Sequence, residues 1–221
     1  MSTVAEPGQQ SAEPRIRLTG VDWDTFWALA SNSRGARFAF DRGVLEIMSP
    51  GPFHESRKGL TADFVRIASL GLRIPRLPMG STTWGNEEAA RGIEADECFY
   101  FAPEKITAAN EAIARMSNDQ SDYPPPDMAV EVDLRHPLID RPSIFATIGV
   151  TELWRFAGKT LLIEQLQDDG TYAESAASRF LPISAKEAQR WLIDEDSSDR
   201  SAWEERVAEW ARGLARGGQS G

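Results

Sequence analysis

The sequence contains few residues that bind soft metals or form disulfides. Among its 221 residues, Cys98 is the only cysteine, and His54 and His136 are the only histidines. A single cysteine excludes an intramolecular disulfide and a multi-cysteine zinc site, and two histidines exclude a histidine-rich metal site. Any metal ion that this chain binds is therefore expected to have oxygen ligands.

Long apolar segments and two familiar catalytic motifs are also missing. No apolar run is long enough to cross a bilayer, and the polar residues 1–13 contain no signal-peptide hydrophobic segment. We therefore expect a cytoplasmic protein with no membrane partner. The sequence has neither Gly-x-Ser-x-Gly nor Gly-x-x-x-x-Gly-Lys, which argues against a serine hydrolase and against a P-loop nucleotide site.

Positive charge is scarce overall but unevenly distributed. The net charge of −10 argues against a protein that coats nucleic acid through bulk charge. Residues 1–90 carry ten basic and ten acidic side chains, whereas residues 91–221 carry fourteen and twenty-four. A basic surface is therefore expected to come from the first part of the chain, which supplies Arg34, Arg37, Arg42, Arg57, Lys58, Arg66, Arg73 and Arg76.

The order of the predicted elements indicates an α/β protein with a mixed central sheet flanked by helices. Length and composition favour one domain with appendages: a disordered tail over residues 1–16, a core domain over 17–180, a helical extension over 181–215 and a flexible tail over 216–221. Hydrophobic periodicity predicts helices and strands along the core. The predicted helices cover residues 19–30, 53–70 ended by Gly71, a short one from 103, 138–149, 184–193 and 201–215, and the strands cover 37–40, 44–48, 74–79, 82–84, 95–101, 127–134, 151–156, 160–166 and 171–174, with a polar loop through Gly92.

The strand predicted after Pro126 carries charge on one face. Side chains alternate along a strand, so Glu131 and Asp133 share a face, opposite Val130 and Val132. One interpretation is a strand whose polar side faces water. If the strand is central, however, both faces are covered, and two unpaired buried carboxylates are costly unless a cation such as Mg²⁺ binds them.

Two further acids lie at the ends of predicted elements. Glu55 is in the first turn of the long helix, where an acid commonly stabilises the helix dipole. Asp96 opens the aromatic strand, beside Glu94 and Glu97, where it could equally be a solvated turn residue. Either acid gains a functional interpretation only if the fold brings it to Glu131.

Six segments, in this order, resemble the Uma-type restriction endonuclease family of bacterial proteins, which belongs with the PD-(D/E)xK nucleases. They are Gly43-Val-Leu-Glu-Ile-Met-Ser-Pro, Pro52-Phe-His-Glu55, Gly80-Ser-Thr-Thr-Trp84, Glu94-Ala-Asp96-Glu-Cys-Phe-Tyr100, Pro125-Pro-Asp-Met-Ala-Val-Glu-Val-Asp133 and Gly149-Val-Thr-Glu-Leu-Trp154. The resemblance implies a restriction-endonuclease-like core with a metal site for phosphodiester hydrolysis. By that resemblance Asp96 is the aspartate of the motif, Glu131 is the glutamate of its ExK part, and Glu55 is an acid on the preceding helix.

The sequence departs from the family motif at two positions. Asp133 occupies the place of the motif lysine, which is expected to orient or deprotonate the attacking water, and Ala95 occupies the place of a proline. Arg141, Arg135 and Lys58 are the cations nearby, and Arg141 falls where relatives tend to carry a basic residue. Arginine stays protonated, so of these three only Lys58 could both stabilise charge and act as a base.

These observations predict an endonuclease dependent on Mg²⁺ or Mn²⁺ that acts on nucleic acid, with DNA the expected substrate. Asp96, Glu131 and Glu55 are the expected metal ligands, and Asp133, Arg141 and Lys58 complete the expected catalytic set. Nucleases of this type that cut both strands are often homodimers. The alternative is a catalytically inactive nuclease-fold protein that acts as a binding or homodimeric module, with the helical stripe of Trp203, Val207 and Trp210 as interface or as core.

Overall fold

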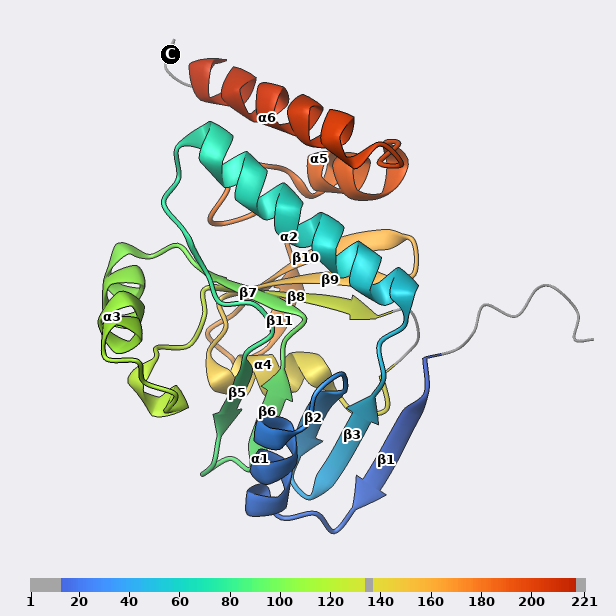
Figure 1. The fold of residues 1–221 in the computed structure, drawn as a ribbon, viewed down its shortest axis with the longest axis vertical. Helices are drawn as coiled ribbons and strands as arrows, with labels where there is room; N and C mark the ends of the chain where they lie inside the picture. Colours follow the sequence, from blue (N-terminus) through green and yellow to red (C-terminus); the bar gives the residue numbers. More distant parts are fainter. Residues whose placement is uncertain (1–12, 134–136, 218–221) are drawn as a thin grey trace, which may run out of the picture.

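The computed structural model describes residues 13–133 and 137–217, which form two β-sheets with helices packed on them (Figure 1). The helices are α1 (Trp23–Asn32), α2 (Pro52–Leu72), α3 (Pro103–Ala114), the 3₁₀-helix η1 (Gln120–Asp122), α4 (Arg141–Ile148), α5 (Ala185–Gln189), the π-helix η2 (Arg190–Asp194) and α6 (Arg200–Gly217). The strands are β1 (Arg15–Thr19), β2 (Arg37–Asp41), β3 (Val44–Met48), β4 (Leu77–Pro78), β5 (Thr83–Asn86), β6 (Arg91–Glu94), β7 (Glu97–Tyr100), β8 (Met128–Asp133), β9 (Glu152–Ala157), β10 (Thr160–Leu166) and β11 (Tyr172–Glu174).

The first sheet is antiparallel, in the order β1-β3-β2-β6-β5. Its β2–β3 hairpin forms where the sequence predicts it, because Arg42 and Gly43 have φ of +46° and +86° and so supply the two left-handed residues of a tight hairpin turn. Helix α1 covers one face of this sheet and buries Phe26 against Phe40. Asp22 caps α1 by accepting a hydrogen bond from the Thr25 backbone N–H, at 2.8 Å.

The second sheet has the order β11-β10-β9-β8-β7-β4 and places β8 in its interior. Strand β8 is antiparallel to β7 and parallel to β9, and α4 lies in the crossover between β8 and β9. Val130 packs with Phe64 of α2 on one side of the sheet, and Ala129 packs with Phe145 of α4 on the other. All six residues of β8 are buried, so the charged face of this strand does not look at water.

Several element boundaries differ from the predicted ones. Arg15 and Ile16, assigned to the disordered tail, begin strand β1, which pairs with β3; residues 1–12 lie outside the described part of the chain. Arg91 and Gly92, predicted as the end of a polar loop, instead begin strand β6, which lies between β2 and β5. Gly92 is needed there because a Cβ at this position would lie 2.3 Å from the Phe26 ring. Strand β1 pairs with β3, and β6 pairs with the distant β2 as well as with its chain neighbour β5, so local periodicity alone did not reveal either strand.

The end of the long helix was also predicted incorrectly. Helix α2 continues through Gly71 to Leu72 and ends at Arg73, which has φ of +60°. Gly71 instead permits close packing of α2 against α6, since a Cβ at Gly71 would lie 2.6 Å from the Ala211 Cβ. Both of those atoms are fixed to helix backbones, so neither can move away cheaply.

Gly71→Ala is therefore expected to destabilise the fold by about 1–3 kcal/mol, because the two helices must separate to admit the methyl group. Gly59→Ala on the same helix is the matched control. Nothing lies within 4 Å of a Cβ at Gly59, so the better helix propensity of alanine should stabilise the fold by up to about 1 kcal/mol. Urea unfolding of the two variants measures both changes, and an equal effect of the two substitutions would contradict this interpretation of Gly71.

The C-terminal helices contribute to the core. Trp203 and Val207 of α6 are fully buried in the same cluster as Phe64 and Trp154, and the Trp210 ring stacks on Phe64 with 6.0 Å between centroids. Trp203 and Val207 of this stripe are thus core residues, and Trp210, which is partly buried, packs against the same core. No helix within the described ranges is both long and apolar enough to span a membrane.

Candidate active site

Asp96 and Glu131 lie side by side although 35 residues separate them. Asp96 lies just before β7, and Glu131 is on the neighbouring strand β8. The backbone N–H of Asp96 donates to Glu131 Oε1 at 3.3 Å, and the backbone N–H of Val132 donates to Asp96 Oδ2 at 2.8 Å. Each of the two acids is only 1 % exposed. The antiparallel register of β7 and β8 therefore builds a buried pair of carboxylates.

Arg141 binds Glu131 and two further acids. Its Nη1 lies 2.8 Å from Glu131 Oε2 and 3.4 Å from Asp133 Oδ1, and its Nη2 lies 2.5 Å from Glu46 Oε1. Arg141 is the first residue of α4, where Asp140 caps the helix and Pro142 fits the first turn as predicted. The start of α4 thus places one buried guanidinium over the acidic face of β8.

Arg15 joins the same group from the edge strand β1. Its guanidinium lies 3.2 Å from Glu46, 3.5 Å from Asp133 and 3.5 Å from Glu13. Glu46 is fully buried and also accepts a hydrogen bond from the Leu138 backbone N–H. The first sheet therefore contributes both an acid and a cation to a site centred on the second.

His54 and Arg37 connect Asp96 to the start of α2. His54 Nε2 lies 3.1 Å from Asp96 Oδ2, and Arg37 Nε lies 3.5 Å from Asp96 Oδ1. Arg37 also lies 3.4 Å from Glu55, which in turn is 3.4 Å from Lys58 Nζ. The Glu55 side chain is 46 % exposed, so Glu55 and Lys58 lie at the outer side of the site, within reach of solvent.

Burial and neighbouring charges shift the pKa values of these acids in opposite directions. Burial by itself would raise the pKa of Asp96, but hydrogen bonding and positive charge from His54 outweigh it and hold that pKa below its usual value. Burial and the nearby Asp96 charge raise the pKa of Glu131 well above normal, although Arg141 opposes the shift. Burial likewise raises the pKa of Asp133, and it raises the pKa of Glu94 to about 7. Asp96 is accordingly the acid of this group that ionises most easily.

The donor types fit a hard divalent cation. Carboxyl groups outnumber guanidiniums: three arginines, Arg15, Arg37 and Arg141, pair with seven acids, namely Glu13, Glu46, Glu55, Glu94, Asp96, Glu131 and Asp133. Oδ2 of Asp133 is buried and accepts no hydrogen bond within the described chain. Carboxylate oxygens are the ligands that Mg²⁺ prefers. In residues 13–133 and 137–217, however, no three acid, histidine or cysteine side chains are arranged as a ligand shell, and Arg141 contacts both Glu131 and Asp133.

The six residues singled out from the sequence therefore form two neighbouring groups. Asp96, Glu131, Asp133 and Arg141 share the buried interior, whereas Glu55 and Lys58 lie outside it and connect to Asp96 through His54, Arg37 and Ser81. Arg135 lies outside the described residues. Cys98 is buried, and burial raises its pKa to about 12, so its thiol is poorly suited to act as a nucleophile.

Sequence reasoning missed five members of the site: Glu13, Arg15, Arg37, Glu46 and His54. The signal for Glu46 was a lone charge inside the apolar run Val44–Met48, since such a residue needs a buried partner. His54 is adjacent to Glu55 and was considered only as a metal ligand. For Arg15 and Arg37 the sequence carries no comparable signal, because their positions depend on how the two sheets meet.

Comparison with known proteins gives one match. Residues 23–192 match the family model of Uma2, which is described as "Putative restriction endonuclease". A comparison with curated proteins finds no match. The match spans all the site residues named above except Glu13 and Arg15, and the mixed α/β architecture agrees with the restriction-endonuclease-like fold predicted from the sequence.

Proposed function

Because this chain belongs to the Uma2 family of restriction-endonuclease-like proteins, we propose that it is a divalent-metal-dependent endonuclease that hydrolyses phosphodiester bonds in DNA. The observation that carries the proposal is the buried pair of Asp96 and Glu131 on neighbouring strands, joined by the hydrogen bond from the Asp96 backbone. Family membership supports a nuclease acting on nucleic acid. The metal, the choice of DNA and the residue roles below are our proposal.

Asp96 and Glu131 would hold a Mg²⁺ or Mn²⁺ ion, with Glu55 or Asp133 as a further ligand. Such an ion supplies a Lewis acid that lowers the pKa of a water molecule and offsets the charge of the scissile phosphate. His54 supports this arrangement, because its Nε2 holds Asp96 in place and favours the ionised carboxylate.

The two nearby cations would have different roles. The charges of its three acidic partners overcome the effect of burial and raise the pKa of Arg141, so it stays protonated and cannot act as a base. Lys58 lies on the more open side, with Nζ 3.0 Å from Ser81 Oγ, and Ser81 in turn donates to the Asp96 backbone carbonyl at 3.0 Å. Lys58 could therefore orient the attacking water and stabilise the charge that develops on the phosphate.

One observation favours the second candidate, an inactive nuclease-fold protein that serves as a binding or homodimeric module. Arg141 already pairs with Glu131, Asp133 and Glu46, and this is how a site without a metal would stabilise its buried acids. Under this alternative the acids serve the stability of the fold, and divalent cations have no specific place to bind.

Titration with divalent cations separates the two candidates. If Mn²⁺ binds only the folded site, a free concentration one hundred times its Kd should stabilise the protein by about 2.7 kcal/mol, which is roughly 5–10 °C in Tm for a chain of this size. Glu131→Gln should lose most of this shift, whereas Glu205→Gln, a change at an exposed acid of α6, should keep it. No shift in the unsubstituted protein, or equal shifts in the two variants, favours the module.

A further inference from the structure

Two shallow grooves lie at the C-terminal end of α2. The larger has a volume of about 460 Å³ and runs between α2 and the chain leading into β4, with Arg73 and Arg76 in its wall. The smaller, about 280 Å³, lies between α2 and α6 and has Arg212 in its wall. Both grooves are lined by Leu70 and Arg73, so they form one continuous surface, and Leu70 is 70 % exposed within it.

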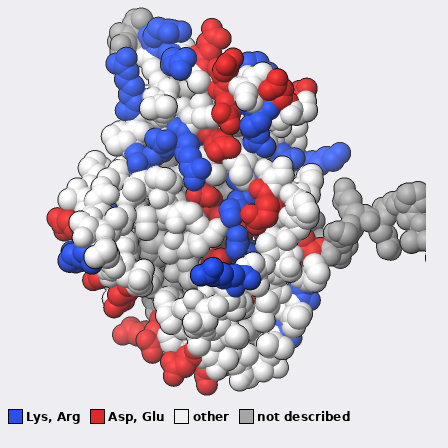
Figure 2. All heavy atoms as spheres, viewed as in Figure 1, with Lys and Arg blue, Asp and Glu red and all other residues white. Residues whose placement is uncertain are grey.

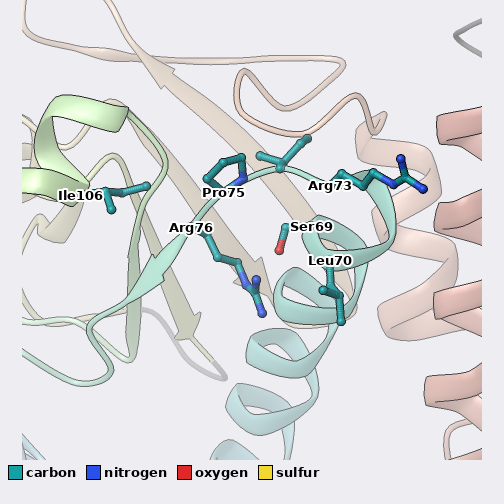
Figure 3. Close-up of a pocket in the computed structure, with 7 residues that line it drawn as sticks. Ser69, Leu70, Arg73, Pro75, Arg76 and Ile106 are labelled. Carbon is teal, nitrogen blue, oxygen red and sulfur yellow. The ribbon is translucent and has the colours of Figure 1, made fainter. Parts of the chain in front are cut away.

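The three arginines of this surface have no acidic partner within residues 13–133 and 137–217. Nε of Arg76 is buried and makes no hydrogen bond in that part of the chain. Figure 3 shows the Arg76 side chain beside the last turns of α2, whereas the Arg73 side chain extends away from Arg76. In a chain with a net charge of −10, three unpaired guanidiniums in one place call for an external anion. Because Arg73 and Arg76 extend in different directions, this surface suits several anionic groups in a row better than one small anion.

Two further cations of α2 lie between this surface and the candidate active site. Lys58 pairs with Glu55 at the outer side of the site, and its charge also acts on Glu97. Arg66, two helical turns further along α2, lies 3.2 Å from Glu97, and its charge is felt at Arg76. Figure 2 shows Lys and Arg side chains over this face, from the upper left to the centre, with Asp and Glu among them. We call Lys58, Arg66, Arg73, Arg76 and Arg212 the α2 basic track.

We propose that the α2 basic track binds the phosphate backbone of duplex DNA on one side of the candidate active site. This inference rests on the proposed function and adds the direction in which the substrate lies. Lys58 and Arg73 are about 22 Å apart along the helix axis, at roughly 1.5 Å per residue, and this length matches about six or seven base pairs at roughly 3.4 Å each. Arginine suits this role because its guanidinium pairs with phosphate through two parallel hydrogen bonds.

The salt dependence of DNA binding tests the inference. The probe is a fluorescein-labelled 20-base-pair duplex of arbitrary sequence in EDTA, with the full chain, and Kd is measured between 50 and 200 mM NaCl. Removing one arginine–phosphate pair should reduce the slope of log K against log salt by about 0.9. The double variant Arg73→Gln with Arg76→Gln should therefore lower the slope by about 1.8 and weaken binding at 100 mM NaCl by at least about tenfold.

The matched control is Lys159→Gln with Arg179→Gln, which removes two exposed cations from the β9–β10 turn and from the segment after β11. This control should bind like the unsubstituted protein. If the two double variants bind equally well while the unsubstituted protein binds and cuts DNA, the proposal that the α2 basic track binds DNA is wrong. The proposed function is then unaffected. If the unsubstituted protein neither binds the duplex nor cuts DNA in Mg²⁺ or Mn²⁺, both proposals fail.

Discussion

Asp96→Asn is expected to reduce Mg²⁺-dependent cleavage of supercoiled plasmid DNA by at least about 100-fold. Loss of groups that merely support a metal ligand typically costs 10- to 100-fold, so loss of a ligand itself should cost at least as much. Asparagine retains a side-chain oxygen that can accept the hydrogen bond from the Val132 backbone N–H, and it keeps the size of the buried side chain. The variant is therefore expected to fold with its β7–β8 pairing unchanged.

Glu131→Gln should have an equally large effect on cleavage. The neutral amide can still accept the hydrogen bond from the Asp96 N–H, and Arg141 keeps Asp133 and Glu46 as partners. Circular dichroism and thermal unfolding serve as the folding control, and Glu205→Gln serves as the activity control. A Glu131→Gln or Asp96→Asn variant that cuts as fast as the unsubstituted protein would remove these two acids from the reaction.

Arg141→Met is expected to destabilise the protein by about 3–5 kcal/mol, the largest loss of stability that we predict for one substitution. Methionine fills much of the space of the arginine stem but leaves Glu46, Glu131 and Asp133 without their shared cation, in a region where Arg141 itself is only 4 % exposed. For a chain of this size the change corresponds to a fall in Tm of roughly 6–20 °C.

Two comparisons isolate the cause of that loss. Arg115→Met removes a guanidinium that is 59 % exposed and lies 3.8 Å from Asp122, and it should change stability by less than about 0.5 kcal/mol. In a Glu131→Gln background the cost of Arg141→Met should be smaller, because one uncompensated carboxylate is already gone. If the two effects add without coupling, or if Arg141→Met unfolds like the unsubstituted protein, Arg141 does not balance these acids.

The sequence predicted the elements whose conformation depends on residues close together in the chain. The β2–β3 hairpin follows from Asp41-Arg42-Gly43, and strand β8 follows from the Val-rich alternation after Pro126, although the pattern left open whether its acidic face is buried. Gly71 shows the opposite case. Its sequence context is that of a helix end, yet the residue is required by the approach of α6 from 140 positions away, at Ala211. No pattern near Gly71 contains that information.

In the candidate site, too, residues in local motifs could be predicted, and residues placed by tertiary packing could not. Asp96 and Glu131 were found because each begins or lies on a strand in a recognisable motif, and the pairing of β7 with β8 brings them together. Arg15 and His54 were not found, since their contacts with Asp133 and Asp96 depend on the docking of β1 and α2 against the second sheet. Charge neutralisation in a buried site is a tertiary property, so the cations that provide it are the hardest part to predict.

The most direct test of the account is where Mn²⁺ binds. Crystals of the protein grown with Mn²⁺ and measured above the manganese absorption edge would locate the ion by its anomalous scattering. The account predicts a peak in contact with both Asp96 and Glu131, with the Arg141 guanidinium displaced from Glu131. A peak that touches neither acid, or no peak while the Arg141–Glu131 pair stays intact, would contradict it.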